Sequence, residues 1–114
     1  MQNVLEQLTA VLEARKQAGE TEKSYVASLH AKGLDQILKK VAEESGETLL
    51  AAKDVQHGAD KSKLIYETAD LWFHTLVLLS HLDLSAQDVL NELARRFDLS
   101  GLDEKAAREG YGFR

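Results

Sequence analysis

The stretch from Leu64 to Leu82 constrains the fold of this chain more than any other part of the sequence. It reads LIYETADLWFHTLVLLSHL, and its only formally charged residues are Glu67 and Asp70. A helix that is apolar nearly all round belongs in a protein interior, so we expect a buried, central helix. The two acids are three residues apart and therefore neighbours on the helix surface, with no Lys or Arg in the stretch to pair with them. Because buried carboxylates are rarely left unpaired, the stretch predicts a site as well as a core helix.

The rest of the chain favours a single all-α domain. Its 114 residues include no proline, which ends helices, and no run of alternating apolar and polar residues that would indicate a strand. Periodic apolar residues and capping signals predict four helices. One ends near Gly19, one runs from about Leu34 to Lys53, one follows Asp60 and one follows Ser85. We therefore expect a fold that resembles a four-helix bundle.

The remaining segments carry further expectations about packing. The polar segment from Gly19 to Gly33 is long for a connection in a bundle, and loops of this length are often functional. We expect Trp72 and Phe73 in the core. The last helix is expected to bury four apolar side chains, Val89, Leu90, Leu93 and Phe97. The domain is predicted to span residues 1–108, followed by a loose charged tail at 109–114.

Composition excludes several classes of protein and suggests a partner. The net charge of −5 and a pI near 5.3 argue against nucleic-acid binding, and the absence of cysteine excludes disulfides and thiolate chemistry. The N-terminus does not resemble a signal peptide, and the apolar stretch around residues 71–79 is too short and too polar to span a membrane. We therefore expect a cytoplasmic protein. The excess of apolar residues between 76 and 82 predicts packing against a second subunit in a homodimer.

A second acidic cluster, Glu43-Glu44-x-x-Glu47, lies on the helix predicted from Leu34 to Lys53. On a helical wheel the apolar stripe is centred near residues 41 and 45, Glu44 lies on its flank, and Glu43 and Glu47 point nearly opposite. Taken alone, this cluster is typical of a solvated face on which Lys39 and Lys40 pair with the acids.

The two clusters together favour a metal site over a solvated face. Two helices that each offer a carboxylate pair at i,i+3 can face each other and enclose a hard cation, and Mg²⁺ prefers such oxygen ligands. A di-iron site is the obvious rival on a helical bundle, but it requires Glu-x-x-His motifs, and the sequence contains none. The four histidines, His30, His57, His74 and His81, are expected to be structural or exposed.

The spacing of the acids resembles a known signature. Glu43-Glu44-x-x-Glu47, nineteen intervening residues and Glu67-x-x-Asp70 are similar to the pattern of the all-α nucleoside triphosphate pyrophosphohydrolases, the MazG-like superfamily. The neighbouring residues are more specific, in particular the stretches SYVASL at 24–29, AKGLD at 31–35, ILKKV at 37–41 and YETADL at 66–71. Over roughly residues 5 to 108 the chain resembles the phosphoribosyl-ATP pyrophosphatase family of histidine biosynthesis.

The resemblance implies an activity, a cofactor and a set of site residues. The reaction would be the Mg²⁺-dependent hydrolysis of 1-(5-phosphoribosyl)-ATP to 1-(5-phosphoribosyl)-AMP and pyrophosphate, on a MazG-type fold completed by dimerisation. The metal ligands would be Glu44, Glu47, Glu67 and Asp70, with Glu43 behind them or orienting the water. The candidate substrate contacts are Lys23, Ser24, Tyr25, Lys32, Lys39 and Lys40. For each of these a plainer role is open, the lysines as solvated ends and Tyr25 as a loop anchor.

Two other functions stay open at the level of sequence. The first is a house-cleaning pyrophosphohydrolase that uses the same acids on free or damaged nucleoside triphosphates. The second is a non-catalytic helical dimerisation module whose acids are only surface charge. The two differ in a simple observable, because only the enzyme readings predict stabilisation by Mg²⁺ that depends on Glu67 and Asp70.

Overall fold

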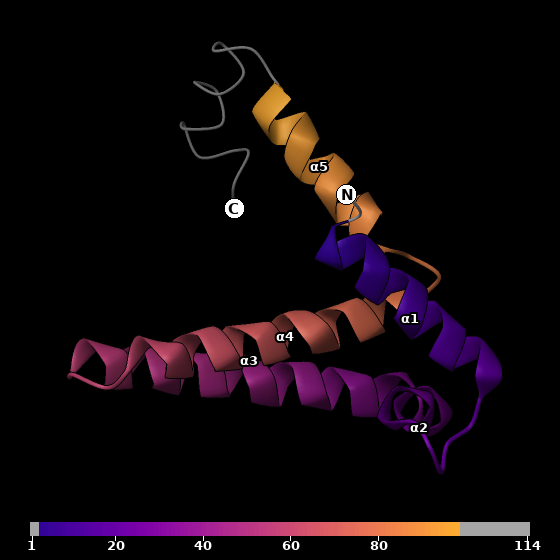
Figure 1. Ribbon diagram of the computed structural model, residues 1–114, viewed down its shortest axis with the longest axis horizontal. Helices are drawn as coiled ribbons and strands as arrows, with labels where there is room; N and C mark the ends of the chain where they lie inside the picture. The colour runs from indigo at the N-terminus through magenta and orange to yellow at the C-terminus, as the bar shows by residue number, and fades with distance from the viewer. Residues whose placement is uncertain (1–2, 99–114) are drawn as a thin grey trace.

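The computed structural model describes residues 3–98, and these form five helices and no strand (Figure 1). The helices are α1 (Val4–Ala18), α2 (Tyr25–Lys32), α3 (Leu34–Gln56), α4 (Lys61–His81) and α5 (Ala86–Asp98). The prediction of an all-α fold is therefore confirmed. The predicted tail at 109–114 lies outside the described residues.

The expectation of a long connection before residue 34 was wrong, because this segment contains α2. Ser24 caps the helix by accepting a hydrogen bond from the Ala27 amide at 3.1 Å, and Val26 and Leu29 are buried. Only Gly33 separates α2 from α3, and it has a φ of +98° that other residues rarely adopt. With eight residues and a polar start, α2 is too short to produce a clear helical period in the sequence.

Three other predicted helix boundaries are confirmed by their caps, whereas α3 ends at Gln56, three residues beyond the end predicted near Lys53. Gly19 ends α1 in the left-handed conformation, and its amide donates to the Arg15 carbonyl. The Asp60 side chain accepts from the Ser62 amide at the start of α4. Before α5, the Ser85 amide donates to the Asp88 carboxylate at 2.9 Å. These local hydrogen bonds satisfy backbone groups that a helix end leaves unpaired.

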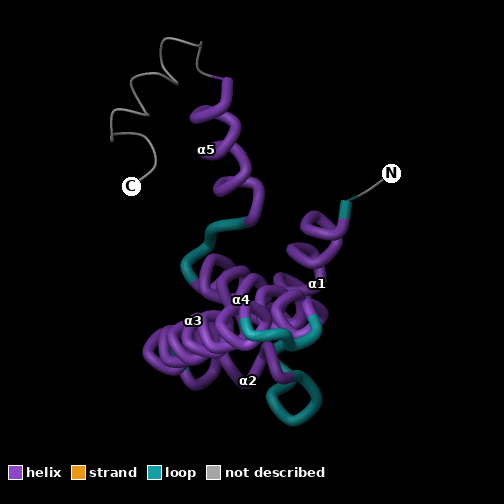
Figure 2. The backbone as a smooth tube through the Cα atoms, turned by 90° about the vertical axis from the view of Figure 1, so that its left-hand side faces the viewer, coloured by secondary structure: helices purple, strands orange, loops and turns teal. Residues whose placement is uncertain are grey.

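Helices α3 and α4 are the two longest helices in residues 3–98, and they lie side by side in antiparallel orientation (Figure 1). Helix α1 crosses one end of the pair, α2 lies beside the start of α3, and α5 projects away from the pair (Figures 1 and 2). A core joins α1 to α4 through four fully buried side chains, Leu12, Leu29, Ile37 and Val77. No helix in residues 3–98 is long and apolar enough to cross a membrane.

Much apolar surface in the described chain is not covered, contrary to the expected burial. Trp72 is 60 % exposed and Phe97 is 66 % exposed, and Val89 and Leu93 are also exposed, whereas Phe73 is half-buried. The radius of gyration is 16.9 Å, compared with about 13 Å for a compact domain of this length. Within residues 3–98, α4 packs mainly against α1 and α3, so its Trp72 side remains largely exposed.

Candidate metal centre

The side of α3 that faces α4 is defined by Ile37, Glu44 and Ala51, which are buried at seven-residue intervals. This face is rotated from the apolar stripe expected near residues 41 and 45, so Glu47, which the helical wheel places nearly opposite that stripe, lies within reach of α4. The reason is that Leu38 and Leu49, which define much of the apolar stripe, are exposed in the single chain. Glu44 is instead turned towards α4.

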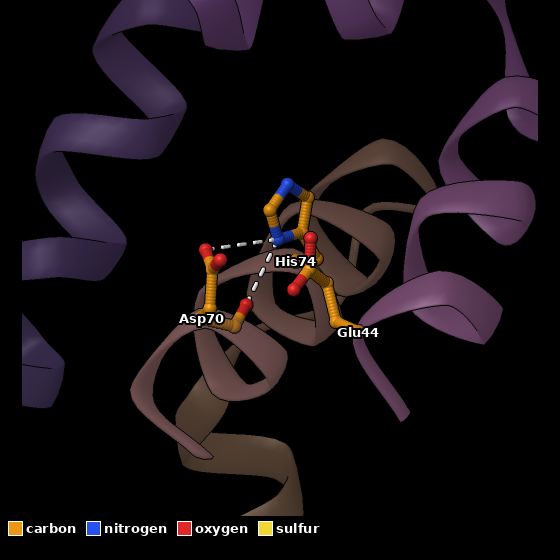
Figure 3. A group of neighbouring side chains, drawn as sticks. All are labelled: Glu44, Asp70 and His74. Atoms are coloured by element: carbon orange, nitrogen blue, oxygen red, sulfur yellow. Dashed lines mark hydrogen bonds and ion pairs between the residues drawn. The ribbon is translucent and has the colours of Figure 1, made fainter. Parts of the chain in front are cut away.

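Four carboxylates meet where α3 and α4 lie side by side. Glu44 and Glu47 of α3 and Glu67 and Asp70 of α4 each offer an oxygen, and these oxygens all lie within 4.8 Å of one another. Glu44 is only 4 % exposed, Glu67 and Asp70 are half-buried, and Glu47 lies at the open edge. Figure 3 shows the inner part of this cluster, with Glu44 pointing from α3 towards Asp70 on α4.

The electrostatics of this cluster are unfavourable without a cation. Glu44 Oε2 is buried and has no hydrogen-bond partner among the described residues. Burial, followed by the charge of Asp70, raises the pKa of Glu44 above its ordinary value, and burial together with Glu47 raises the pKa of Glu67. A donor set made entirely of carboxylate oxygens fits a hard divalent cation of the Mg²⁺ class, which would lie among the opposing charges and remove the repulsion.

Thr48 holds the two helices together beside the acids. Its hydroxyl donates to the Glu44 carbonyl at 2.8 Å and lies 3.3 Å from the Glu67 carbonyl of the facing helix. One side chain therefore links the backbones that carry the two innermost glutamates. Thr48 could not be recognised as part of the site from the sequence, since a threonine within a helix gives no signal of a hydrogen bond to the facing helix.

Lys40 lies at the edge of the cluster and pairs with Glu43. Its Nζ is 3.2 Å from Glu43 and 3.6 Å from Glu44, and the hydrogen bond to Glu43 raises the pKa of Lys40. Glu43 is exposed and does not join the four clustered carboxylates. The paired, solvated face expected from α3 alone is therefore present in part. Lys40 pairs with Glu43 and Glu44, whereas Lys39 forms no ion pair within residues 3–98, and the face does not account for Glu47, Glu67 or Asp70.

The other candidate substrate contacts lie at different distances from the acids. Tyr25 is linked to them through His74, whose Nε2 lies 2.8 Å from the Tyr25 hydroxyl and whose Nδ1 lies 3.6 Å from the Asp70 carboxylate, and burial raises the pKa of Tyr25. Ser24 is buried, and its hydroxyl is used as the cap of α2. Lys23 is exposed in the turn before Ser24, Lys39 is exposed on α3, and Lys32 is at the opposite end of α2 from Tyr25.

His74 is a second residue beside the acids whose contacts could not be predicted from the sequence. It is buried against the cluster, with Nδ1 2.8 Å from the Asp70 carbonyl oxygen and 3.6 Å from the Asp70 carboxylate (Figure 3). Its Nε2 lies 2.8 Å from the Tyr25 hydroxyl. The spacing of Asp70 and His74 on one helix was visible in the sequence, but the contact with Tyr25 depends on α2. The other histidines are away from the acids, with His57 exposed and His30 paired with His81.

Fold and site together define the chain as an all-α protein with a four-carboxylate centre between two antiparallel helices. The family model described as phosphoribosyl-ATP pyrophosphohydrolase matches residues 5–97. A protein of Janthinobacterium sp. (strain Marseille) named phosphoribosyl-ATP pyrophosphatase is 59 % identical over 111 residues, covering 96 % of this chain and 98 % of that protein. One of the same name from Hydrogenovibrio crunogenus (strain DSM 25203 / XCL-2) is 58 % identical over 106 residues, covering 93 % of each. The chain belongs to the phosphoribosyl-ATP pyrophosphohydrolase family, as its resemblance implied.

Proposed function

We propose that the protein hydrolyses 1-(5-phosphoribosyl)-ATP to 1-(5-phosphoribosyl)-AMP and pyrophosphate, as a step of histidine biosynthesis in the cytoplasm. Water is added across the anhydride between the α- and β-phosphates, and pyrophosphate leaves. The observation that carries the proposal is the four-carboxylate cluster, with its buried unpartnered oxygen, in a chain of this family. Phosphoryl chemistry depends mainly on positioning and electrostatics, so no nucleophilic side chain is required.

In this proposal Mg²⁺ is held by Glu44, Glu47, Glu67 and Asp70. The ion would supply charge neutralisation for the phosphates and a more acidic water. Thr48 fixes the spacing of the two helices. Because Glu44 is buried and Glu47 is exposed, the substrate would approach the cluster from the Glu47 side. The exposed carboxylate of Glu43, at the rim, is suited to orient a water molecule.

The lysines around the cluster are suited to the anionic part of the substrate. Lys40 lies closest to the acids, and Lys23 and Lys39 are exposed. Lysine binds phosphate as a mobile point charge, so exposed side chains of this kind serve without a fixed geometry. Lys32 would take part only if the substrate extends along α2, since it lies at the end of that helix away from Tyr25.

We also propose that the protein is a homodimer and that residues 1–108 form its single domain. An apolar groove of about 490 Å³ runs between α3, α4 and α5, and its walls include Val41, Leu71, Trp72, Val89 and Leu93. The groove is bordered by apolar residues that are exposed in the described part of the chain. A second copy of the same helices offers a matching apolar surface, which is the usual basis of a symmetric interface.

The first test is pyrophosphate release from phosphoribosyl-ATP with Mg²⁺, run beside ATP, dUTP and an EDTA control. We expect release from phosphoribosyl-ATP alone and none with EDTA. Release mainly from the free nucleotides would assign the protein to house-cleaning chemistry. No release from any of them would contradict an enzymatic role.

The double variant Glu67→Gln/Asp70→Asn tests the acids directly. Loss of a single partner behind a metal ligand costs about 10–100-fold, so loss of two ligands is expected to lower turnover by more than about 100-fold. Mg²⁺ should raise the Tm of the wild type but not of this variant. Glu20→Gln/Glu22→Gln, in the exposed turn before α2, removes the same charge elsewhere and should behave as wild type. Equal stabilisation of both double variants by Mg²⁺ would place the metal elsewhere.

A further inference from the structure

The contacts of His74 assign a direction to each of its hydrogen bonds. Its Nδ1 lies 2.8 Å from the Asp70 backbone carbonyl, which can only accept, so Nδ1 carries the proton. In the neutral ring the other nitrogen is then an acceptor. The partner of that nitrogen is the Tyr25 hydroxyl at 2.8 Å, which donates to it in this neutral form of the ring. The two hydrogen bonds therefore run in one direction, from the Tyr25 hydroxyl to the His74 imidazole and from the imidazole to the Asp70 carbonyl.

The Tyr25 side chain makes several contacts and is nevertheless half exposed to solvent. Its ring is stacked on Phe73, with centroids 6.5 Å apart and planes 17° apart, and it meets the edge of His74 at 80°. The side chain is nevertheless 50 % exposed. Burial and the neighbouring acids raise the pKa of the hydroxyl, which favours the protonated form that donates to His74.

We propose that His74 is a positioning residue that holds Tyr25, and with it the N-terminal end of α2, beside the four carboxylates. This inference rests on the proposed function, since it assigns Tyr25 to the bound substrate. Because the hydroxyl proton is committed to His74, Tyr25 offers the substrate its exposed ring and an oxygen lone pair. It does not act as the acid that protonates the leaving pyrophosphate.

Three variants separate the parts of this arrangement. Tyr25→Phe keeps the ring and removes the donor, His74→Leu removes both hydrogen bonds of the imidazole, and His74→Gln restores an acceptor near the position of Nε2. A lost hydrogen bond of this kind corresponds to about a tenfold change, which we expect as a higher KM for phosphoribosyl-ATP with kcat nearly unchanged. His74→Gln should recover most of the loss.

The two residues act as one unit in this proposal, so their effects should not add. The double variant Tyr25→Phe/His74→Leu is expected to raise KM by about the same tenfold as either single change. Tyr66→Phe and His57→Gln are matched controls, because both side chains are exposed and have no hydrogen-bond partner in the described part of the chain. The alkaline limb of the pH–rate profile should be the same in Tyr25→Phe and wild type, since the hydroxyl gives up no proton during the reaction.

A spectroscopic measurement tests the geometry without turnover. The imidazole ¹⁵N shifts of His74 should report a protonated Nδ1 and a bare Nε2, and Tyr25→Phe should move the Nε2 shift alone. The opposite tautomer would overturn the proposal, and the Tyr25→Phe and His74→Gln pair still decides it if His74→Leu does not fold. An unchanged KM in Tyr25→Phe, or additive losses in the double variant, would overturn the role of His74 and leave the proposed function standing. Absence of turnover by the wild type would overturn the proposed function instead.

Discussion

Glu44 is the residue at which burial and charge conflict most strongly. It is nearly inaccessible to solvent, has one carboxylate oxygen without a partner in the described chain, and lies beside three other acids. Protons and a divalent cation are both able to relieve this repulsion, so they should compete for the cluster. The pH dependence of stability therefore carries information about metal binding.

The first prediction concerns the metal-free protein and Glu44. A carboxylate with a raised pKa binds more protons when folded, so its contribution to stability falls as pH rises from its ordinary value of 4.5 through the folded value. In EDTA, the wild type should lose stability over this range relative to Glu44→Gln, whose amide does not titrate. Added Mg²⁺ should reverse the order of the two proteins at neutral pH.

Tm measured against pH in EDTA and in Mg²⁺ checks this prediction. Glu6→Gln is a suitable control, because that acid is exposed in the first turn of α1 and distant from the cluster. Parallel curves for wild type and Glu44→Gln in EDTA would show that Glu44 is not strained in the folded state.

At the level of helices, α2 is stabilised by its cap and by a second contact with α4, in addition to the contact of Tyr25 with His74. The Ser24 hydroxyl satisfies the Ala27 amide within the buried start of the helix. At the other end, His30 lies against His81, with the two Nδ1 atoms 2.9 Å apart and the rings stacked. Since Tyr25 lies at the first position of α2, both features should affect the site as well as stability.

The second prediction is that Ser24→Ala lowers the free energy of unfolding by about 1 kcal/mol, the usual cost of an N-cap. The reason is that a buried amide of α2 loses its only side-chain acceptor. Urea unfolding measures the change, and Thr21→Ala, in the exposed turn just before, should have little effect. Equal stability of Ser24→Ala and wild type would mean that α2 is held by packing alone.

The third prediction concerns the His30–His81 pair and acid. Burial, followed by the neighbouring His81 and Lys16, lowers the pKa of His30 below its ordinary 6.5, whereas Glu13 acts in the opposite sense. The unfolded chain then binds more protons, so this contribution to stability is present above pH 6.5 and is lost as pH falls. The Tm of wild type should fall between about pH 7 and 5 more steeply than that of His30→Leu. His57→Gln should follow the wild type, and identical slopes for wild type and His30→Leu would exclude the pair as the cause.

How far the helices could be predicted depended on their length and on local signals. The two long helices, α3 and α4, and the caps at Gly19, Asp60 and Ser85 followed from periodicity and capping chemistry. The helix α2 did not, because eight residues are too few to show a period. The face of α3 that contacts α4 was also predicted incorrectly. A helical wheel assigns every apolar residue to the interior, whereas Leu38 and Leu49 are exposed in the structure.

For the molecule as a whole, the position of the acids could be predicted better than the residues around them. The spacing of Glu44, Glu47, Glu67 and Asp70 predicted that two helices would bring them together, and the structure does so. His74 and Thr48 could not be predicted as parts of the site, since their contacts depend on how α2 and α4 lie against their neighbours. The exposed apolar residues are the largest remaining difference between the expected and the observed burial.

The fourth prediction concerns the exposed apolar residues around the groove. If a second copy covers the groove between α3, α4 and α5, Trp72→Glu should place a charge in the interface and convert a dimer to monomer. Sedimentation velocity at micromolar concentration should show a dimer for wild type and for Lys61→Glu, which alters charge at the exposed start of α4. A monomeric wild type would contradict the homodimer.

Because only Gly33 separates α2 from α3, a small change in the angle between these two helices displaces the far end of α2. Helix α2 is eight residues long, so Tyr25 lies about 12 Å from the joint at Gly33. A rotation of only about 10° at that joint would displace Tyr25 by about 2 Å, more than a hydrogen bond tolerates. Because the Tyr25–His74 hydrogen bond lies at the end of α2 farthest from that joint, it is the contact most sensitive to the angle between α2 and α3.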